Sequence, residues 1–431
     1  MLTAAHICQQ FIAATSLWMF GVAVHAEDWP QWRGPNRDGV WSETGIAETF
    51  PAGGLNIRWR APVGFGFSSP VVAQGRVYVT DSQLEPPKVR DRVLCFDEAT
   101  GQPLWTYSSE ASYPDWAFTP GQESSPCATP IVRDGRVYAP GSLSHRLYCL
   151  ETANGHLLWQ KDLAKEYGIE ETASICSSPL IDGDFLILLI GGKPGACVVA
   201  FDRKSGKETW RSLDEAAAHS SPIIITAGGT RQLIVWTLQS VTALDPATGK
   251  PYWRERFPLG SSSVVATPVF SNNRVLISGL MLKLDADKPV MTVLWPEKLS
   301  QRVLNSTSTA LLRDEFLYSL ESSGDFVCRE AGTGRQIWQT DKVTDRRNAA
   351  SASVHLTVNG DSVLLFNDLG ELIRARLDGE GYHEISRTVL IEPSHPSGGR
   401  KVTWAAPAFA NGHAFARSNT EIVCASLQKT P

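Results

Sequence analysis

The stretch that decides the fold is LYCLETANGHLLW, residues 147–159, which reads as a strand, a tight turn and a second strand ending on tryptophan. It contains Cys149 and His156, residue types that often carry chemistry. Four other segments share its pattern, with an acidic residue eight positions and a glycine four positions before the tryptophan. They are residues 94–105, 199–210, 242–253 and 327–338. The pattern therefore indicates a repeated structural unit.

A second element precedes each of these segments. It reads SSPVVAQGRVY at residues 68–78 and ATPIVRDGRVY at residues 128–138, and weaker forms near Ser308 and His355 bring the number of copies to eight. The series of tryptophans that ends the units has steps of 42 to 54 residues. Each unit holds four short runs rich in Val, Ile, Leu, Tyr and Phe, separated by glycine turns, which is typical of one propeller blade.

The two ends of the repeat complement each other. The last unit, residues 405–427, has three strands, and residues 57–63 form a surplus strand before the first unit. Pairing the two leaves no open sheet edge in the ring. The sequence therefore predicts an all-β protein, one eight-bladed β-propeller of four-stranded antiparallel blades, closed by the N-terminal strand joining the C-terminal blade. We assign residues 57–428 to the propeller and residues 27–56 to a leader segment that packs on it.

Residues 1–26 read as a secretory signal peptide. Residues 12–24 are an uncharged apolar run, shorter than the roughly 20 residues of a membrane-spanning helix. The run ends in a small-x-Ala pattern that suits cleavage before Glu27. No cysteine follows it, so we expect no lipid anchor at that point, and no later segment predicts a transmembrane span. We expect an exported protein, periplasmic or extracellular and soluble after cleavage.

The charge balance bears on the partner. The 431 residues carry a formal net charge of −5 and no basic block. Phosphate binding needs a basic surface, so nucleic acid is not an expected partner.

The repeats resemble those of the pyrroloquinoline quinone (PQQ)-like β-propeller family. The D-x-x-T-G-x-x-x-W and S-S-P-V-V-x-x-G-R-V-Y units carry the resemblance, which covers about residues 29–427. The leader WPQWRGPNRDG, residues 29–39, resembles that of exported bacterial members. The family includes quinoprotein dehydrogenases and a non-enzymatic propeller subunit of the outer-membrane protein assembly machine, so the resemblance implies the fold and leaves the function open.

The resemblance also implies what a dehydrogenase would need. The family's dehydrogenases commonly place two adjacent, disulfide-bonded cysteines against PQQ, with a Ca²⁺ held by Glu, Asn and Asp and an Asp as base. This sequence has no Cys-Cys pair, and no cluster of hard oxygens of the kind calcium needs can be assigned. We therefore predict no catalytic residue, no metal site and no cofactor, with a PQQ-dependent dehydrogenase as the alternative.

One position per blade is expected to face the propeller axis, three residues before the proline of each inner strand. In blade order the residues are Phe67, Cys127, Cys176, His219, Val265, Thr307, Ala352 and Trp404. Most are apolar or small, which indicates packing, and we expect His219 to be a hydrogen-bonded blade residue. A Cys127–Cys176 disulfide is conceivable in an oxidising compartment. Free thiols are favoured, because neighbouring inner strands can hold the Cα atoms beyond the 4.4–6.8 Å that a disulfide requires.

The remaining repeat positions have a structural interpretation. Cys95, Cys149, Cys328 and Cys424 occupy a slot that other blades fill with alanine, so we expect small, buried, unpaired thiols. Each repeated tryptophan is expected to lie over the glycine turn of a neighbouring blade. The structural positions are Trp59, Trp105, Trp159, Trp210, Trp253, Trp295 and Trp338, with Gly101, Gly155, Gly206, Gly249 and Gly334.

Candidate ligand or partner residues lie where the copies differ. They are His219 and Trp404 near the axis, and Asp115, Trp116 and Glu123 in the long loop at residues 108–125. Trp29, Trp32 and Arg33 of the leader are expected to pack on the propeller rather than to bind substrate.

These features predict a non-enzymatic scaffold that binds protein or polypeptide through its blade-face loops, and the resemblance to the outer-membrane assembly propeller implies envelope-protein assembly as one version. The alternatives are the PQQ-dependent dehydrogenase and a carbohydrate-binding propeller that uses Trp41, Trp116 and Trp236. The sequence does not predict an oligomeric state.

Overall fold

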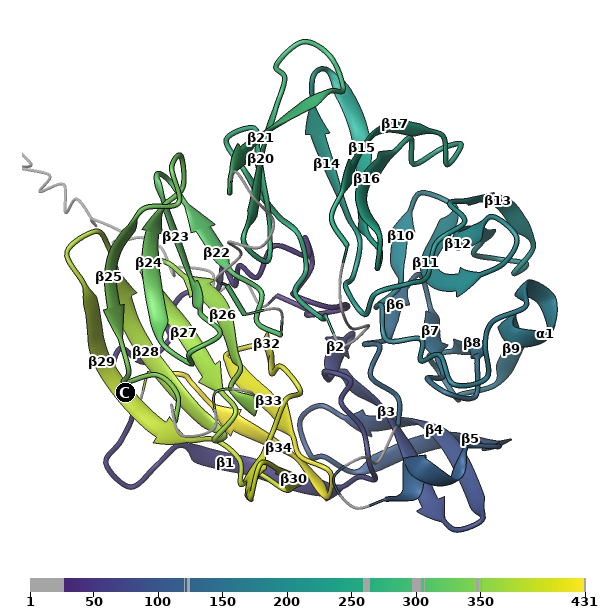
Figure 1. Ribbon diagram of the computed structural model, residues 1–431. Coiled ribbons are helices and arrows are strands. Elements are labelled where there is room, and N and C mark those ends of the chain that lie inside the picture. The colour runs from purple at the N-terminus through teal and green to yellow at the C-terminus, as the bar shows by residue number, and fades with distance from the viewer. Residues whose placement is uncertain are drawn as a thin grey trace, which may run out of the picture.

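The protein is a ring of eight four-stranded antiparallel sheets arranged around a central axis (Figure 1). The computed structural model describes residues 27–119, 121, 125–258, 264–296, 304–305, 307–345, 349 and 351–429. The predicted eight-bladed propeller is confirmed, and the predicted signal peptide lies outside the described residues. Neither of the helical segments described has the length and apolar character that crossing a membrane requires.

The first seven blades follow one another along the chain, each running from an inner to an outer strand. Blades one to four are β2–β5 (Val71–Ala73, Arg76–Glu85, Lys88–Asp97, Pro103–Ala111), β6–β9 (Ile131–Arg133, Arg136–Pro140, Arg146–Glu151, Leu157–Asp162), β10–β13 (Leu180–Asp182, Phe185–Gly192, Ala196–Asp202, Glu208–Ser212) and β14–β17 (Ile223–Ala227, Thr230–Trp236, Ser240–Leu244, Pro251–Arg256). Blades five to seven are β18–β21 (Val269–Ser271, Arg274–Ile277, Leu280–Leu284, Met291–Trp295), β22–β25 (Leu311–Arg313, Phe316–Leu320, Phe326–Glu330, Gln336–Thr340) and β26–β29 (Val354–Asn359, Ser362–Asn367, Glu371–Leu377, Tyr382–Val389).

The eighth blade joins the two ends of the propeller sequence. It contains β32 (Ala408–Ala410), β33 (His413–Arg417), β34 (Glu421–Ser426) and β1 (Asn56–Pro62). Strand β1 pairs antiparallel with β34, with Trp59 opposite Cys424. The purple and yellow strands that meet in Figure 1 are this pair. The predicted closure is confirmed, and the ring has no open gap between its first and last blades.

In the described ranges of the chain, three short elements lie between the blades. They are the 3₁₀ helix η1 (Asp115–Phe118), the α-helix α1 (Leu163–Tyr167) and the hairpin of β30 (His395–Ser397) and β31 (Arg400–Val402). The side chain of Asp162 caps the N-terminus of α1, and Gly168 ends the helix in the left-handed conformation. The segment with η1 interrupts the regular repeat between the first two blades.

Neighbouring blades contact each other through tryptophan rings and glycine turns. A Cβ on Gly155 would lie 2.5 Å from the Trp105 ring, and Trp105 Nε1 donates to the carbonyl oxygen of Thr152 in the same turn at 2.9 Å. The same ring-on-glycine contact occurs at Trp59–Gly101, Trp159–Gly206, Trp210–Gly249 and Trp295–Gly334. Trp253 and Trp338 instead donate to Gln232 Oε1 and to the carbonyl oxygen of Asp378.

The cysteines of the repeat are packing residues. Cys95, Cys149, Cys328 and Cys424 are buried and unpaired, as predicted, and so is Cys197. Burial raises the pKa of the Cys149 thiol to about 11, so this thiol stays protonated and unreactive near neutral pH. His156 lies exposed in the turn that follows. The two residues of the opening stretch that suggested chemistry therefore belong to the repeated unit.

Candidate functional site

The leader, residues 27–56, spans one face of the ring. Trp29 exchanges two backbone hydrogen bonds of 2.9 Å with Val72 on β2 of the first blade. The backbone N–H of Trp41 donates to the carbonyl oxygen of Val358 on β26 of the seventh blade at 2.8 Å. The segment between these points thus crosses the end of the axial channel. We call the opposite end of the propeller the open face.

Arg37 fixes the middle of the leader to the inner strands. Its buried guanidinium donates to the carbonyl oxygens of Ser178, Pro179 and Pro222 at 3.0, 2.7 and 3.1 Å. Burial lowers the pKa of Arg37 to about 9, with a smaller contribution from the charge of Arg33. The guanidinium remains protonated at neutral pH and connects the third and fourth blades through their backbone.

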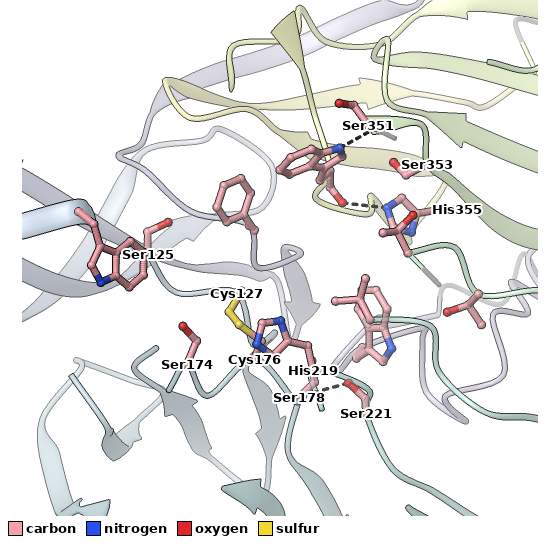
Figure 2. Close-up of a pocket in the computed structure, with 17 residues that line it drawn as sticks. Ser125, Cys127, Ser174, Cys176, Ser178, His219, Ser221, Ser351, Ser353 and His355 are labelled. Atoms are coloured by element: carbon pink, nitrogen blue, oxygen red, sulfur yellow. Dashed lines mark hydrogen bonds between the residues drawn. A yellow bond between two sulfur atoms is a disulfide. The ribbon is translucent and has the colours of Figure 1, made fainter. Parts of the chain in front are cut away.

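A cavity of about 470 Å³ lies on the axis where the inner strands converge (Figure 2). Trp32 of the leader lines it at one end. Seven of the eight predicted axial positions also line it: Phe67, Cys127, Cys176, His219, Val265, Thr307 and Trp404. At the remaining position, Ala352, the residues that line the cavity are its neighbours Ser351 and Ser353. The register was predicted correctly, but these side chains surround a cavity instead of filling the axis.

An aromatic cluster forms one wall of the cavity. The rings of Phe67 and Trp404 lie 5.7 Å apart, and the ring of His395 lies 5.0 Å from each of them. Trp404 Nε1 donates to the carbonyl oxygen of Ser351 at 3.0 Å, which holds the indole in place. Such contacts give the wall a fixed shape.

A chain of hydroxyl groups runs around the inner strands. The residue before the inner-strand proline is Ser or Thr in five blades, and Thr309 holds the same place in the sixth blade, where alanine replaces the proline. Four of these hydroxyls accept a hydrogen bond from the backbone N–H of the equivalent residue one blade earlier. The pairs are Ser69–Thr129, Thr129–Ser178, Ser178–Ser221 and Thr267–Thr309, each at 3.0 Å. The hydroxyl of Thr267 instead accepts from Nε1 of the leader's Trp32 at 2.8 Å. The repeated hydroxyl therefore links neighbouring blades and positions the leader.

Cys127 and Cys176 form a disulfide at the cavity wall (Figure 2). Their Cα atoms are 4.8 Å apart, so the expectation of free thiols is wrong for this pair. Both residues precede an inner strand, β6 or β10, and the segments that lead into these strands approach each other near the axis. The disulfide joins the second and third blades across 49 residues of sequence. It differs from the adjacent-cysteine ring that the family's dehydrogenases commonly contain.

Two histidines line the cavity in the neutral form. Burial lowers the pKa of His219 to about 4, and burial is also the main cause that lowers the pKa of His355 to about 4. Nε2 of His355 lies 2.8 Å from the carbonyl oxygen of Trp404. Because a carbonyl only accepts, this nitrogen carries the proton. The His219 ring makes no hydrogen bond with any residue that the structure describes, so the expected hydrogen-bonded blade residue is not observed.

The three other sequence candidates have different outcomes. Trp116, in η1, lines the cavity and is 39% exposed, so the cavity reaches solvent beside its ring. Asp115 precedes it in η1, is exposed and does not line the cavity. Glu123 lies outside the described residues. The structure thus brings His219, Trp116 and Trp404 together at one cavity, and their role in binding stays a prediction.

Sequence reasoning missed several lining residues, among them His355, Trp32 and the serines of the inner layer. His355 lies in a weak copy of the repeat, where the axial spacing selected Ala352 instead. Trp32 was expected only to pack, because no repeat relates the leader to the blades. The pre-proline hydroxyl visible in the repeat was the one available signal for a polar inner layer.

The described lining of the cavity carries no formal charge near neutral pH. It consists of serine and threonine hydroxyls, aromatic rings, one valine, the disulfide and the two neutral histidines. Within the described residues, no group of three or more His, Cys, Asp or Glu is arranged to hold a metal ion. This arrangement can bind through aromatic contact and neutral hydrogen bonds.

The sequence profile of the outer membrane protein assembly factor BamB matches residues 54–199 and 194–388. The chain belongs to this family. The BamB of Burkholderia pseudomallei is 24% identical over 70% of the chain and 74% of that protein. The quinoprotein ethanol dehydrogenase of Pseudomonas aeruginosa is 26% identical over 44% of the chain and 29% of the dehydrogenase. The chain therefore spans less than a third of the length of that dehydrogenase.

Solved structures of both kinds of protein share the fold of this BamB-family chain. The BamB of Moraxella catarrhalis superposes with a TM-score of 0.58 at 16% identity, covering 86% of this chain and 98% of that one. The quinohemoprotein alcohol dehydrogenase of Comamonas testosteroni superposes with a TM-score of 0.65 at 13% identity, covering 94% of this chain and 81% of the dehydrogenase. At these identities the likeness establishes the propeller architecture and not a shared activity.

The part of the cavity lining that the structure describes does not fit the cofactor that the dehydrogenases use. PQQ carries carboxylate groups, which require cationic partners when they are removed from water. A calcium ion beside it requires several convergent oxygen ligands, carboxylates among them. The described lining offers neither cations nor carboxylates. Its neutral hydroxyls and imidazoles suit a ligand without charge.

Proposed function

We propose that this BamB-family propeller is an exported, non-enzymatic scaffold of the cell envelope, with a role in the assembly of envelope proteins. It binds protein or polypeptide through the loops on its open face. The uncharged donor set of the axial cavity carries this proposal, because it supports binding without the groups that quinone chemistry requires. The match to the profile of an assembly factor supports it independently.

The open face is the one available for partners at the axis. On the opposite end, the leader covers the channel through the backbone pairs of Trp29 and Trp41 and through Arg37. On the open face, Trp116 presents a partly exposed indole beside the cavity. Aromatic residues next to a concave apolar site are frequent centres of binding energy in protein interfaces.

The competing function is that of a PQQ-dependent dehydrogenase. The dehydrogenase relatives and the presence of a disulfide in the axial cavity favour it.

The third candidate function is carbohydrate binding. Two of the three aromatic residues considered for it, Trp41 and Trp236, are fully buried and unavailable to a sugar. Only Trp116 remains available to a sugar, and one exposed ring does not distinguish sugars from other partners.

Site-specific photo-crosslinking in cells tests the scaffold proposal. A photoreactive residue replaces Trp116 on the open face, and the control places it at Leu158, which is 42% exposed on outer strand β9. We expect envelope proteins to be captured from position 116 and not from position 158. Equal capture from both positions would contradict binding at the open face. If the purified protein reduces a dye in the presence of alcohols, PQQ and Ca²⁺, the scaffold proposal is wrong and the protein is a PQQ-dependent dehydrogenase.

A further inference from the structure

We propose that the axial cavity is a binding site for an uncharged aromatic ring that carries a hydrogen-bonding group. The inference rests on the same uncharged lining as the scaffold proposal, but it concerns the ligand of the cavity and not a partner on the open face, so the two have separate tests. The cavity volume of about 470 Å³ lies within the range of roughly 300–1,000 Å³ that is usual for small-molecule sites.

Aromatic surface is available at three places in the cavity. Trp32 lines it from the leader, Phe67 and Trp404 form the wall, and Trp116 lies where the cavity reaches solvent. The ring of Trp32 is fixed by its hydrogen bond to Thr267. A flat ligand can contact these rings edge-to-face or by offset stacking.

The His219 ring is the polar group that a ligand can satisfy. It lines the cavity and makes no hydrogen bond with any described residue, although buried polar groups normally have partners. A phenol, an indole or an amide placed in the cavity can provide that partner. The hydroxyl oxygens of Ser125 and Ser353 also have no partner among the described residues, but they have almost no accessible surface and are covered by the cavity wall.

The charge of the lining selects for a neutral ligand. Moving an anion into the cavity removes its hydration, and the described lining has no cation to replace that hydration. His219 and His355 do not act as cations at neutral pH, because burial lowers the pKa of each to about 4. An aromatic carboxylate should therefore bind much more weakly than the neutral ring of the same size.

The ligand enters from the open face. Trp32 lines the opposite end, and Arg37 holds the adjoining leader to three backbone carbonyl oxygens. Trp116 at the mouth therefore contacts the ligand or its attached group. A ring borne on a polypeptide side chain and a free aromatic compound both satisfy this geometry, and peptide groups flanking the ring would distinguish them.

Titration calorimetry on the whole exported protein tests the site. The probes are phenol and indole, with benzoate as the anionic counterpart and N-acetyl-tryptophanamide as a ring flanked by peptide groups. We expect phenol or indole to bind at one site per chain, at least tenfold more tightly than benzoate. Tighter binding of the amide than of indole would assign the ring to a polypeptide side chain, and the reverse order would assign it to a free compound.

Two variants and one matched control locate the binding. Val265→Trp fills the cavity and should abolish binding, whereas Val293→Trp adds the same ring on exposed strand β21 and should leave the affinity unchanged. Trp116→Ala changes a partly exposed side chain, leaves the fold intact and should weaken binding about three- to tenfold, the range for one aromatic contact. Benzoate binding as tightly as indole, no binding of any neutral probe, or full affinity in both Val265→Trp and Trp116→Ala would overturn the proposal.

Discussion

The indole ring of Trp105 lies directly against Gly155 in the turn of the next blade, where a Cβ would come within 2.5 Å of the ring. Gly155 has a φ of 74°, a conformation that favours glycine. The glycine is therefore required twice, once by its own backbone and once by the neighbouring ring. This relationship explains why glycine and tryptophan recur together in the repeat.

Replacing Gly155 separates these two requirements when it is compared with Gly135. Gly135 also has a φ of 74°, but a Cβ there would meet only Thr152 Oγ1, at 4.0 Å. Gly135→Ala should cost about 1–2 kcal/mol through backbone strain alone, and Gly155→Ala roughly 1–3 kcal/mol more through overpacking. Urea unfolding measures both. Equal losses in the two variants would show that the ring contact contributes nothing.

Arg37 should be the strongest single attachment of the leader. Arg37→Ala leaves three buried carbonyl oxygens without the charged donor that they share, and we expect a loss of about 3 kcal/mol in the free energy of unfolding. The matched control is Arg60→Ala, which removes a half-exposed ion pair with Glu421 and should cost less than about 1 kcal/mol. An Arg37→Ala variant as stable as the wild type would rule out this attachment.

The Cys127–Cys176 disulfide should contribute to stability by linking two blades. The double variant Cys127→Ser, Cys176→Ser should lower the free energy of unfolding by about 2–4 kcal/mol, and a reductant should then have no further effect on its melting temperature. Peptide mapping without reduction should recover the fragments containing Cys127 and Cys176 as one linked species. Recovery of two separately alkylated peptides would show that Cys127 and Cys176 do not form a disulfide.

Acidification should destabilise the protein through the cavity histidines. The pKa of His219 and of His355 is about 4 in the folded state, against about 6.5 in an unfolded chain. Between these values the unfolded state binds more protons, so stability falls as the pH falls from about 6.5 to 4. His219→Gln should reduce the slope by about 1.4 kcal/mol per pH unit at most, while His156→Gln serves as the exposed control. An unchanged slope in His219→Gln would place that ring in a hydrated environment.

The repeat determined how much of the fold could be predicted. Because each unit repeats the same turn and tryptophan, one alignment of the copies fixed the blades, the closing strand and the axial positions such as Phe67 and Thr307. Ala352 was the exception, since the weak copy near His355 does not show whether one residue or its neighbours face the axis.

Features that depend on distances between blades were not predictable. The approach of Cys127 to Cys176 depends on how two separate segments converge, and their spacing of 49 residues contains no such information. The path of the leader was not predictable either. Arg37 donates a hydrogen bond to the carbonyl oxygen of Pro179, 142 residues further along the chain, and no repeated pattern relates the two residues. The cavity depends on the convergence of the blades and on the path of the leader, because the blades form its walls and Trp32 of the leader forms one end.

The most direct test of the neutral cavity, and of the scaffold that it supports, is equilibrium binding of PQQ. The melting temperature of the protein is measured with Ca²⁺ and increasing PQQ, beside a parallel titration with indole. We predict that PQQ leaves the melting temperature unchanged and that indole raises it in a saturable manner. A saturable rise with PQQ that depends on Ca²⁺ and is lost in Val265→Trp would contradict the account and assign the cavity to a quinoprotein enzyme.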